Sequence, residues 1–136
     1  MSEPTDLGEL VAVARAARER AYAPYSRFLV GAAVASDGGV FAGANVENAS
    51  YGVSICAERV AAAAAVASGA RRIDAVAVAG PGPRPTPPCG ACRQFLYEFG
   101  PDMIVVSEAP GGDRSQWRLS ELLRDGFGPA ELEGSA

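Results

Sequence analysis

The chain has 136 residues and 49% of them are hydrophobic, which is enough for the core of one ordinary domain. Its net charge is −4 and it has no basic cluster, which argues against a polynucleotide as main partner because phosphate binding needs a concentrated positive surface. No apolar run approaches the ~20 residues of a membrane span and no signal peptide is recognisable, so we expect no membrane partner.

The first half of the chain predicts a helix followed by a hairpin. Apolar residues recur at helical spacing over residues 6–21, and Pro24 then stops the helix. The apolar run 28–35 predicts a strand, the Asp-Gly-Gly sequence at 37–39 predicts a hairpin turn, and 40–45 predicts the returning strand.

A second helix is expected after a loop over residues 46–55. The alanine-rich segment 56–68 favours helix, with Gly69 as its stop. The alternation of Val and Ala over residues 73–79 predicts a buried strand, and the Gly- and Pro-rich segment 80–88 predicts a loop.

The rest of the chain predicts a helix over residues 89–99 and a strand over 103–107. A last strand is expected at 116–119 and a short helix at 120–123, and the residues from Glu131 are expected to be frayed. Strands separated by helices imply parallel crossovers, so we expect an α/β protein with a sheet that is covered on both faces.

The residue types restrict the possible chemistry. All twelve basic residues are arginine, which excludes a lysine Schiff base, and the absence of histidine excludes Ser-His and Cys-His catalysis as usually built. Three cysteines cannot all pair within one chain, so a reducing cytoplasm is the expected location.

All three cysteines lie in two short motifs, Cys56-Ala57-Glu58 and Pro88-Cys89-Gly90-Ala91-Cys92. Three thiolates, one open position and a neighbouring carboxylate are the parts of a catalytic zinc site, whereas a structural zinc normally has four protein ligands. Other interpretations remain open: a C-x-x-C redox pair, a zinc site that Glu58 completes as fourth ligand, or a Glu58 that is a solvated helix residue.

Cys56 and Cys89 each stand at the predicted start of a helix, where unpaired N–H groups and the helix dipole stabilise a thiolate. Glu58 falls in the first turn after Cys56, close enough to face the open metal position. Because three thiolates make a zinc centre negative, we expect a positive group to offset this charge. Arg59 is our candidate for that tuning role, and its alternative is an ordinary surface arginine.

Four motifs together resemble the small homotetrameric zinc-dependent cytidine deaminases. They are Tyr25-Ser26-Arg27-Phe28-Leu29-Val30-Gly31-Ala32-Ala33, Asn45-Val46-Glu47-Asn48-Ala49-Ser50-Tyr51-Gly52, Cys56-Ala57-Glu58-Arg59 and Pro88-Cys89-Gly90-Ala91-Cys92-Arg93-Gln94. The resemblance implies a single domain over residues 1–136 with its core at about 21–129. It also implies a three-layer α/β/α fold with a mixed sheet of about five strands.

The resemblance also implies roles for individual residues. Cys56, Cys89 and Cys92 would bind one Zn²⁺ per subunit. Asn45 and Glu47 would bind the ribose hydroxyls, Phe28 would stack on the pyrimidine, and Ala57 would offer its backbone N–H to the base carbonyl. Without the resemblance, Asn45 would be a turn cap, Glu47 a solvated charge and Phe28 a core residue.

Two aromatic residues would act between subunits of the homotetramer. Phe127, in Gly126-Phe127-Gly128-Pro129, resembles an aromatic residue that reaches a neighbouring subunit's site, and Tyr51 would also serve across an interface. Each active site would then be completed by other chains.

The resemblance implies hydrolytic deamination of cytidine and 2′-deoxycytidine to uridine and 2′-deoxyuridine in pyrimidine salvage, with Glu58 as the proton shuttle. The alternatives are a deaminase of a modified cytosine nucleoside such as blasticidin S, a polynucleotide editor, which the charge disfavours, and a non-catalytic zinc-binding assembly domain. The sequence leaves the preference between cytidine and deoxycytidine undetermined.

Overall fold

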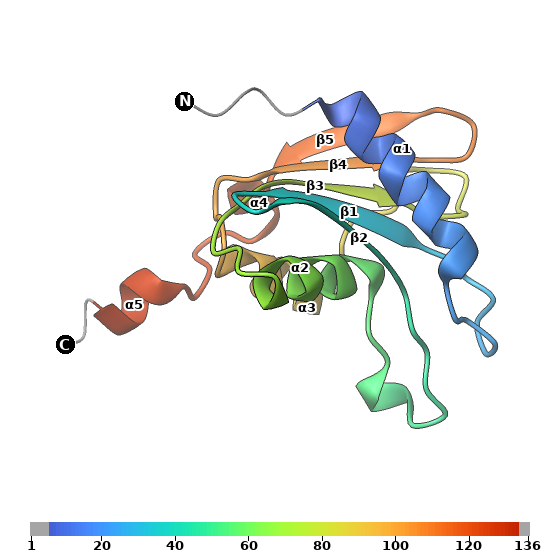
Figure 1. Cartoon of the computed structure of the whole chain (residues 1–136), viewed down its shortest axis with the longest axis horizontal. Helices are drawn as coiled ribbons and strands as arrows, with labels where there is room; N and C mark the ends of the chain where they lie inside the picture. The colour runs from blue at the N-terminus through green and yellow to red at the C-terminus, as the bar shows by residue number, and fades with distance from the viewer. Residues whose placement is uncertain (1–5, 134–136) are drawn as a thin grey trace.

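A five-stranded mixed sheet forms the middle layer of the structure, a computed structural model that describes residues 6–133 (Figure 1). Helix α1 (Leu7–Ala17) lies on one face of the sheet, and helices α2 (Ala57–Ala67) and α3 (Gly90–Tyr97) lie on the other. This arrangement confirms the predicted three-layer α/β/α fold.

The strand order in the sheet is β2-β1-β3-β4-β5. The strands are β1 (Gly31–Ser36), β2 (Gly39–Ala44), β3 (Ile73–Ala79), β4 (Ile104–Glu108) and β5 (Arg114–Arg118). Strand β1 runs antiparallel to both β2 and β3, so β2 and β3 run in the same direction on either side of it. Strands β3 and β4 pair in parallel. The two strand pairs that a helix connects, β2–α2–β3 and β3–α3–β4, therefore both have the expected parallel crossover.

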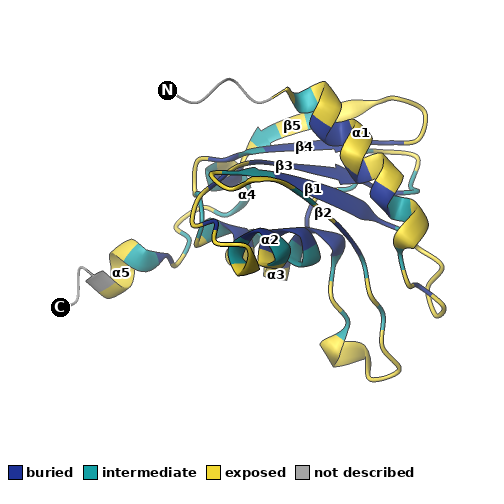
Figure 2. Cartoon of the chain, in the orientation of Figure 1, coloured by how far each residue is buried: buried dark blue, intermediate teal, exposed yellow. Residues whose placement is uncertain are grey.

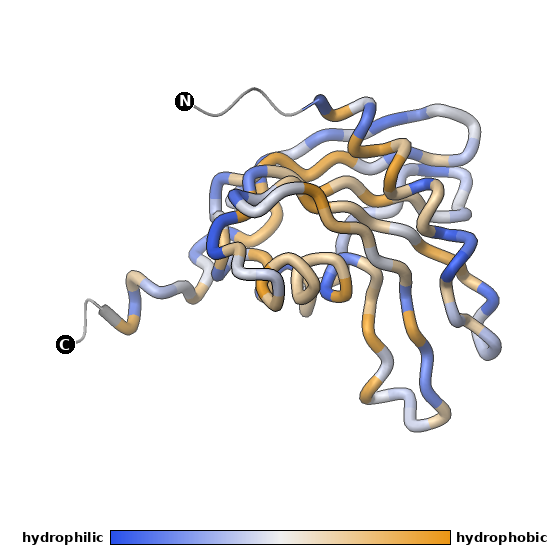
Figure 3. The backbone as a smooth tube through the Cα atoms, in the orientation of Figure 1, coloured by the Kyte–Doolittle hydropathy of each residue, from blue (hydrophilic) through white to orange (hydrophobic). Residues whose placement is uncertain are grey.

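The alternation of Val and Ala along β3 sorts the side chains onto two faces. Val76 and Val78 join the core cluster beneath α2 and α3, whereas Ala75, Ala77 and Ala79 join the cluster beneath α1. Buried residues accordingly dominate the central strands β1, β3 and β4, whereas the edge strand β5 is exposed to intermediate (Figure 2). Hydrophobic residues are concentrated in the sheet and α2 (Figure 3). A strand such as β3, buried except at Asp74, is typical of a sheet that helices cover on both sides.

Four short elements complete the described chain. They are the 3₁₀ turns η1 (Arg18–Arg20) and η2 (Tyr51–Val53) and the helices α4 (Leu119–Leu122) and α5 (Pro129–Glu133). The segment between β2 and α2, which contains η2, projects away from the sheet (Figure 1). Within residues 6–133, the structure has no helix that is long and apolar enough to cross a membrane.

The N-terminal elements differ from the sequence prediction at their ends. The first helix stops at Ala17 instead of residue 21, because Tyr22 forms backbone hydrogen bonds with Asn45 and Glu47 and pulls the chain into an extended conformation. The first strand begins at Gly31 instead of residue 28. Asn45, which lies just past the end of β2, binds the backbone of the preceding residues through its side-chain amide and its own N–H.

The C-terminal elements also depart from the prediction. The last strand and the short helix each begin before their predicted positions, and helix α5 runs through Glu131, where the sequence analysis expected frayed residues. The Glu131 carboxylate accepts a hydrogen bond of 2.6 Å from the backbone N–H of Gly128, which caps α5 at its start. The remainder of the predicted frayed end, residues 134–136, lies outside the described residues.

Gly43 on β2 allows α2 to approach the sheet closely. A methyl group at Gly43 would lie 2.5 Å from the backbone nitrogen of Ala61 and 2.8 Å from the carbonyl oxygen of Ala57. These contacts are far shorter than van der Waals separations, so any side chain here would push α2 away from β2.

We therefore expect Gly43→Ala to lower the free energy of unfolding by about 1–3 kcal/mol, the usual cost of overpacking. Urea denaturation monitored by circular dichroism measures this change. Gly111→Ala is the matched control, because a methyl group there meets no atom within 4 Å. Equal stability of the two variants would contradict the close approach of α2 to β2.

Candidate active site

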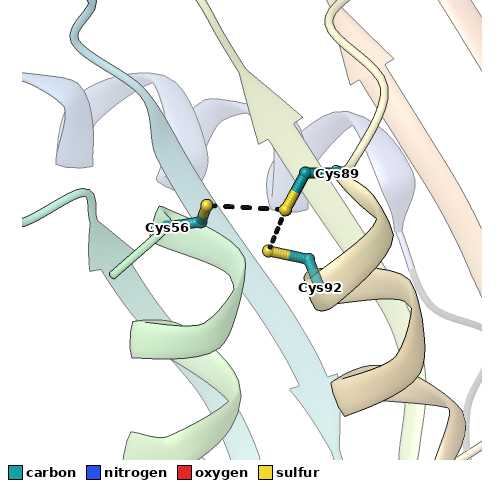
Figure 4. Close-up of side chains that lie close together, drawn as sticks. All are labelled: Cys56, Cys89 and Cys92. Atoms are coloured by element: carbon teal, nitrogen blue, oxygen red, sulfur yellow. Dashed lines mark hydrogen bonds between the residues drawn. The ribbon is translucent and has the colours of Figure 1, made fainter. Parts of the chain in front are cut away.

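The starts of α2 and α3 bring the three cysteines together (Figure 4). Cys56 is the N-cap of α2 and Cys89 is the N-cap of α3, while Cys92 lies one turn into α3. The Sγ atom of Cys89 is 3.6 Å from that of Cys56 and 3.4 Å from that of Cys92. The three sulfur atoms all lie within 4.8 Å of one another. Two segments separated by 33 positions in the sequence thus supply one cluster.

The cluster fits a zinc ion with one open position. Three sulfurs at about 2.3 Å from one tetrahedral Zn²⁺ would lie roughly 3.8 Å apart, close to the observed separations. Thiolate sulfur is a soft ligand that suits this metal. Within the described residues, the cluster contains the three cysteines and no carboxylate, so Glu58 is not part of the ligand group. Three protein ligands are the number that a catalytic zinc site has.

The environment of the cluster favours thiolate at Cys56. Its pKa is lowered to about 5, chiefly because Cys92 donates a hydrogen bond to it and further because Arg59 lies beside it. The pKa of Cys92 is raised by that same hydrogen bond and by burial of its side chain. The first sulfur therefore carries negative charge readily, while Cys92 retains its proton until a cation competes for it.

Arg59 is the cation next to the cluster. Its Nη2 atom is 3.8 Å from the Cys56 sulfur and 3.4 Å from the carbonyl oxygen of Ser54. Its Nε atom is buried without a hydrogen-bond partner among the described residues. The Cys56 contact raises the pKa of Arg59, so the guanidinium stays charged beside the thiolates.

Glu58 is a buried carboxyl group in the first turn of α2. Only 4% of the residue is exposed. Burial raises its pKa to about 7, and the charge of Cys56 acts in the same direction. A carboxyl group with a pKa near neutrality is suited to both accepting and donating a proton. The alternative interpretation of Glu58 as a solvated helix residue is therefore wrong.

A cavity of about 550 Å³ opens beside the cluster. It is lined by Ser26, Phe28, Val30, Asn45, Glu47, Cys56, Ala57, Glu58, Thr86, Pro87 and Cys89. Its size and its combination of apolar walls with a few polar groups are typical of a small-molecule site. The cavity brings together four of the residues for which the sequence analysis expected substrate contacts: Phe28, Asn45, Glu47 and Ala57.

Asn45 and Glu47 organise the cavity wall that carries Phe28. The Asn45 amide accepts a hydrogen bond of 2.9 Å from Val30 N–H and donates one of 2.8 Å to the Phe28 carbonyl oxygen. The Glu47 carboxylate accepts hydrogen bonds from the hydroxyl and N–H of Ser26 and from the N–H of Tyr25, and these bonds lower its pKa. Each side chain keeps further hydrogen-bonding capacity for a ligand.

Tyr51 and Phe127 do not line this cavity in their own chain. Tyr51 packs edge-on against Tyr25, with ring centroids 5.7 Å apart, and lines a neighbouring cavity of about 300 Å³ that shares Ser26 and Glu47 with the larger one. Phe127 is 57% exposed, and its carbonyl oxygen accepts a hydrogen bond of 2.7 Å from the Gln94 amide on α3. Both rings are therefore available to another chain.

The sequence analysis predicted a loop over residues 80–88 but missed Thr86 and Pro87 as cavity residues. They immediately precede the Pro-Cys motif, so proximity to Cys89 was the available signal. Ser26 was also missed as a site residue, although it lies two positions before Phe28.

Comparisons with known proteins agree with this geometry. The family model described as "Cytidine and deoxycytidylate deaminase zinc-binding region" matches residues 4–108. The chain belongs to this family. Its cofactor is zinc, and the matched region includes Cys56, Cys89 and Cys92, the group that is able to hold a metal ion.

Individual relatives are similar over most of the chain. The cytidine deaminase of Halalkalibacterium halodurans is 50% identical over 120 residues, which cover 87% of this chain and 91% of that protein. The cytidine deaminase of Sporosarcina psychrophila is 41% identical over 133 residues, covering 96% and 98%. The crystal structure of cytidine deaminase from Burkholderia pseudomallei has 48% identity and a TM-score of 0.86, and the match covers 90% of this chain and all of that one.

Proposed function

We propose that this protein is a zinc-dependent cytidine deaminase that hydrolyses cytidine and 2′-deoxycytidine to uridine and 2′-deoxyuridine with release of ammonia, as in pyrimidine salvage. The observation that carries the proposal is the buried Glu58 carboxyl group, which lines the cavity together with Cys56 and Cys89. Such a combination suits hydrolysis at an amino-substituted ring carbon.

Glu58 moves the protons in the proposed reaction. When bound, zinc supplies a Lewis acid that activates water for attack at neutral pH. Glu58 accepts a proton from the attacking water and delivers it to N3 of the base as the oxygen bonds to C4. Glu58 then transfers the second proton of that water to the 4-amino group, and the C4–N bond breaks to release ammonia. A carboxyl pKa near 7 allows Glu58 to accept and to donate in one cycle.

The other cavity residues hold the nucleoside. Asn45 and Glu47 bind the ribose hydroxyls with the hydrogen-bonding capacity that remains beyond their contacts to residues 25–30. Phe28 stacks on the pyrimidine, and Ala57 donates its backbone N–H to the base carbonyl, because N–H groups in the first turn of a helix have no partner within that helix.

Glu58→Ala is expected to retain zinc and lose at least about 10³-fold in kcat for cytidine, because the proton shuttle is removed. The fall in ultraviolet absorbance on conversion of cytidine to uridine measures turnover, and metal analysis measures zinc. Glu98→Ala, which removes an exposed carboxylate at the end of α3, is the control. Substantial turnover by the zinc-loaded Glu58→Ala protein would overturn this role.

A modified cytosine nucleoside is the second candidate substrate. The cavity of about 300 Å³ beside Glu47 favours it, because this space shares Ser26 and Glu47 with the larger cavity and would accept a substituent on the sugar. Folded, zinc-loaded protein that converts blasticidin S but not cytidine would establish this alternative. Bound zinc without turnover of either nucleoside would indicate a non-catalytic assembly domain.

Arg59 tunes the zinc centre in this proposal. Three thiolates and one Zn²⁺ carry a net charge of about −1, which weakens the acidifying effect of the metal. The Arg59 guanidinium, 3.8 Å from the Cys56 sulfur, withdraws charge from that ligand.

Arg59→Gln is expected to lower kcat by roughly tenfold or more and to reduce zinc content, since one charge-assisted hydrogen bond is lost beside buried groups. Arg59→Lys, which restores the charge, is expected to recover part of the loss, and Arg20→Gln in the exposed turn η1 is the control. Unchanged zinc content and kcat in Arg59→Gln would exclude the tuning role.

We further propose that the whole chain, residues 1–136 with a core at about 21–129, acts as one cytoplasmic domain that assembles into a homotetramer. Exposed apolar side chains support assembly: Tyr22, Tyr51, Val53 and Ile55 are 42–73% exposed on or beside the projecting segment. In the tetramer, Tyr51 and Phe127 complete the cavities of neighbouring subunits. The three free thiols suit a reducing cytoplasm.

Shared active sites predict that two inactive proteins restore activity when mixed. Phe127→Ala is expected to be weakly active alone, and co-refolding it with an equal amount of Glu58→Ala is expected to regain about a quarter of wild-type sites by random assembly. Mixing Phe127→Ala with the double variant Glu58→Ala/Phe127→Ala is the control. Light scattering gives the oligomeric state, and no recovery in a mixed tetramer would contradict a shared site.

A further inference from the structure

Ser107 on β4 has a buried hydroxyl group that the proposed chemistry does not use. Only three polar or charged residues of the described chain are buried: Glu58, Ser107 and Glu108. Glu58 belongs to the cavity, and Glu108 forms ion pairs with Arg15 and Arg114. The Ser107 hydroxyl instead donates a hydrogen bond of 2.7 Å to the carbonyl oxygen of Thr86. Ser107 therefore reaches the loop that forms one wall of the cavity.

The loop over residues 81–88 depends on side-chain donors from outside. Pro81, Pro83, Pro85, Pro87 and Pro88 have no backbone N–H. Within the described chain, no backbone group of residues 81–88 is hydrogen-bonded to another backbone group. The carbonyl oxygens of Thr86 and Pro88 are held by Ser107 and by the Nε of Arg93, the latter at 2.8 Å. These two donors fix the cavity wall just before Cys89.

Thr86 also packs closely on Gly80. A methyl group at Gly80 would lie 2.4 Å from the Thr86 hydroxyl oxygen and 3.1 Å from its Cβ. Thr86 thus contacts both Gly80, directly after β3, and Ser107, near the end of β4. Because β3 and β4 are parallel neighbours, their carboxyl ends form a rigid base for this loop.

We propose that Ser107, together with Gly80, is a positioning residue that sets the depth of the Thr86–Pro87 wall and hence the affinity for the nucleoside. The proposal rests on the proposed function, because it assigns the cavity to a cytosine nucleoside. Ser107 touches neither the cavity nor the cysteine cluster, so its effect passes through Thr86. It therefore acts on binding of the substrate and leaves the proton shuttle intact.

The chain contains a matched control and a reporter. Ser115 is directly opposite Ser107 in the β4–β5 pair, on the same face of the sheet, and it lines a cavity with residues 83–87. Among the described residues its hydroxyl has no hydrogen-bond partner, so Ser115→Ala removes a hydroxyl beside the loop without removing a bond to it. Trp117 is the single tryptophan of the chain. It lines a cavity of about 520 Å³ against residues 83–87, so its fluorescence responds to displacement of the loop.

The experiment compares Ser107→Ala, Ser107→Thr, Gly80→Ala and Ser115→Ala with the wild type. Ser107→Ala is expected to raise KM for cytidine and Kd for uridine about tenfold, with kcat within about twofold, because one buried hydrogen bond is lost. Zinc content should not change, and Trp117 emission should shift to longer wavelength. Ser107→Thr keeps the hydrogen-bond donor and should have the wild-type KM. Gly80→Ala should raise KM as Ser107→Ala does. Ser115→Ala should leave both KM and Kd unchanged.

A lower Tm for Ser107→Ala with unchanged KM and Kd would overturn the proposal and leave Ser107 a structural residue. If Ser107→Ala does not fold, Gly80→Ala decides by the same measurements, since it displaces Thr86 with Ser107 intact. Failure of the proposed function is distinguishable: the wild type would then neither convert cytidine nor bind uridine. The Trp117 shift would still report whether Ser107 holds the loop.

Discussion

The concentration of negative charge at the starts of α2 and α3 is the constraint on which the site depends. Three cysteine sulfurs within 4.8 Å of one another cannot all ionise unless positive charge is close. The fold supplies such charge from two helix N-termini and the Arg59 guanidinium, and a bound zinc ion would add to it. The sheet makes this arrangement possible, because its parallel crossovers place the starts of α2 and α3 at the same end of the sheet.

The same charge also acts on Glu58. Burial is the main cause that raises the pKa of this carboxyl group, and the Cys56 thiolate two residues earlier acts in the same direction because it disfavours a second negative charge nearby. The metal site and the proposed proton shuttle are therefore electrically coupled, and a change at one alters the other. Only Cys56 shares a helical turn with Glu58, whereas Cys89 and Cys92 come from α3, so the coupling joins the starts of two helices.

Local sequence patterns predicted most of the elements, and the motif spacing pointed to the three cysteines that the fold brings together. Cys56 and Glu58 lie at the N-cap and in the first turn of one helix, so their relation could be predicted from local spacing. The alternation of Val and Ala at 73–79 predicted β3 with its correct bounds. Long-range contacts account for the errors. The early end of α1 depends on Tyr22 pairing with residues 45–47, and the wall at Thr86 depends on Ser107 from another strand. Neither contact has a local signal.

Asn45 and Glu47 have a structural role in addition to the ligand contacts that we propose for them. Before any ligand binds, their side chains hold the backbone from Tyr25 to Val30 and thereby fix Phe28. A ligand that meets these two groups and the aromatic ring meets a surface that is already ordered, so little conformational entropy is lost on binding. A substitution at Asn45 would consequently remove a proposed ligand contact and also loosen the backbone between Phe28 and Val30. Its effect on affinity should exceed that of one hydrogen bond, because two functions share one side chain.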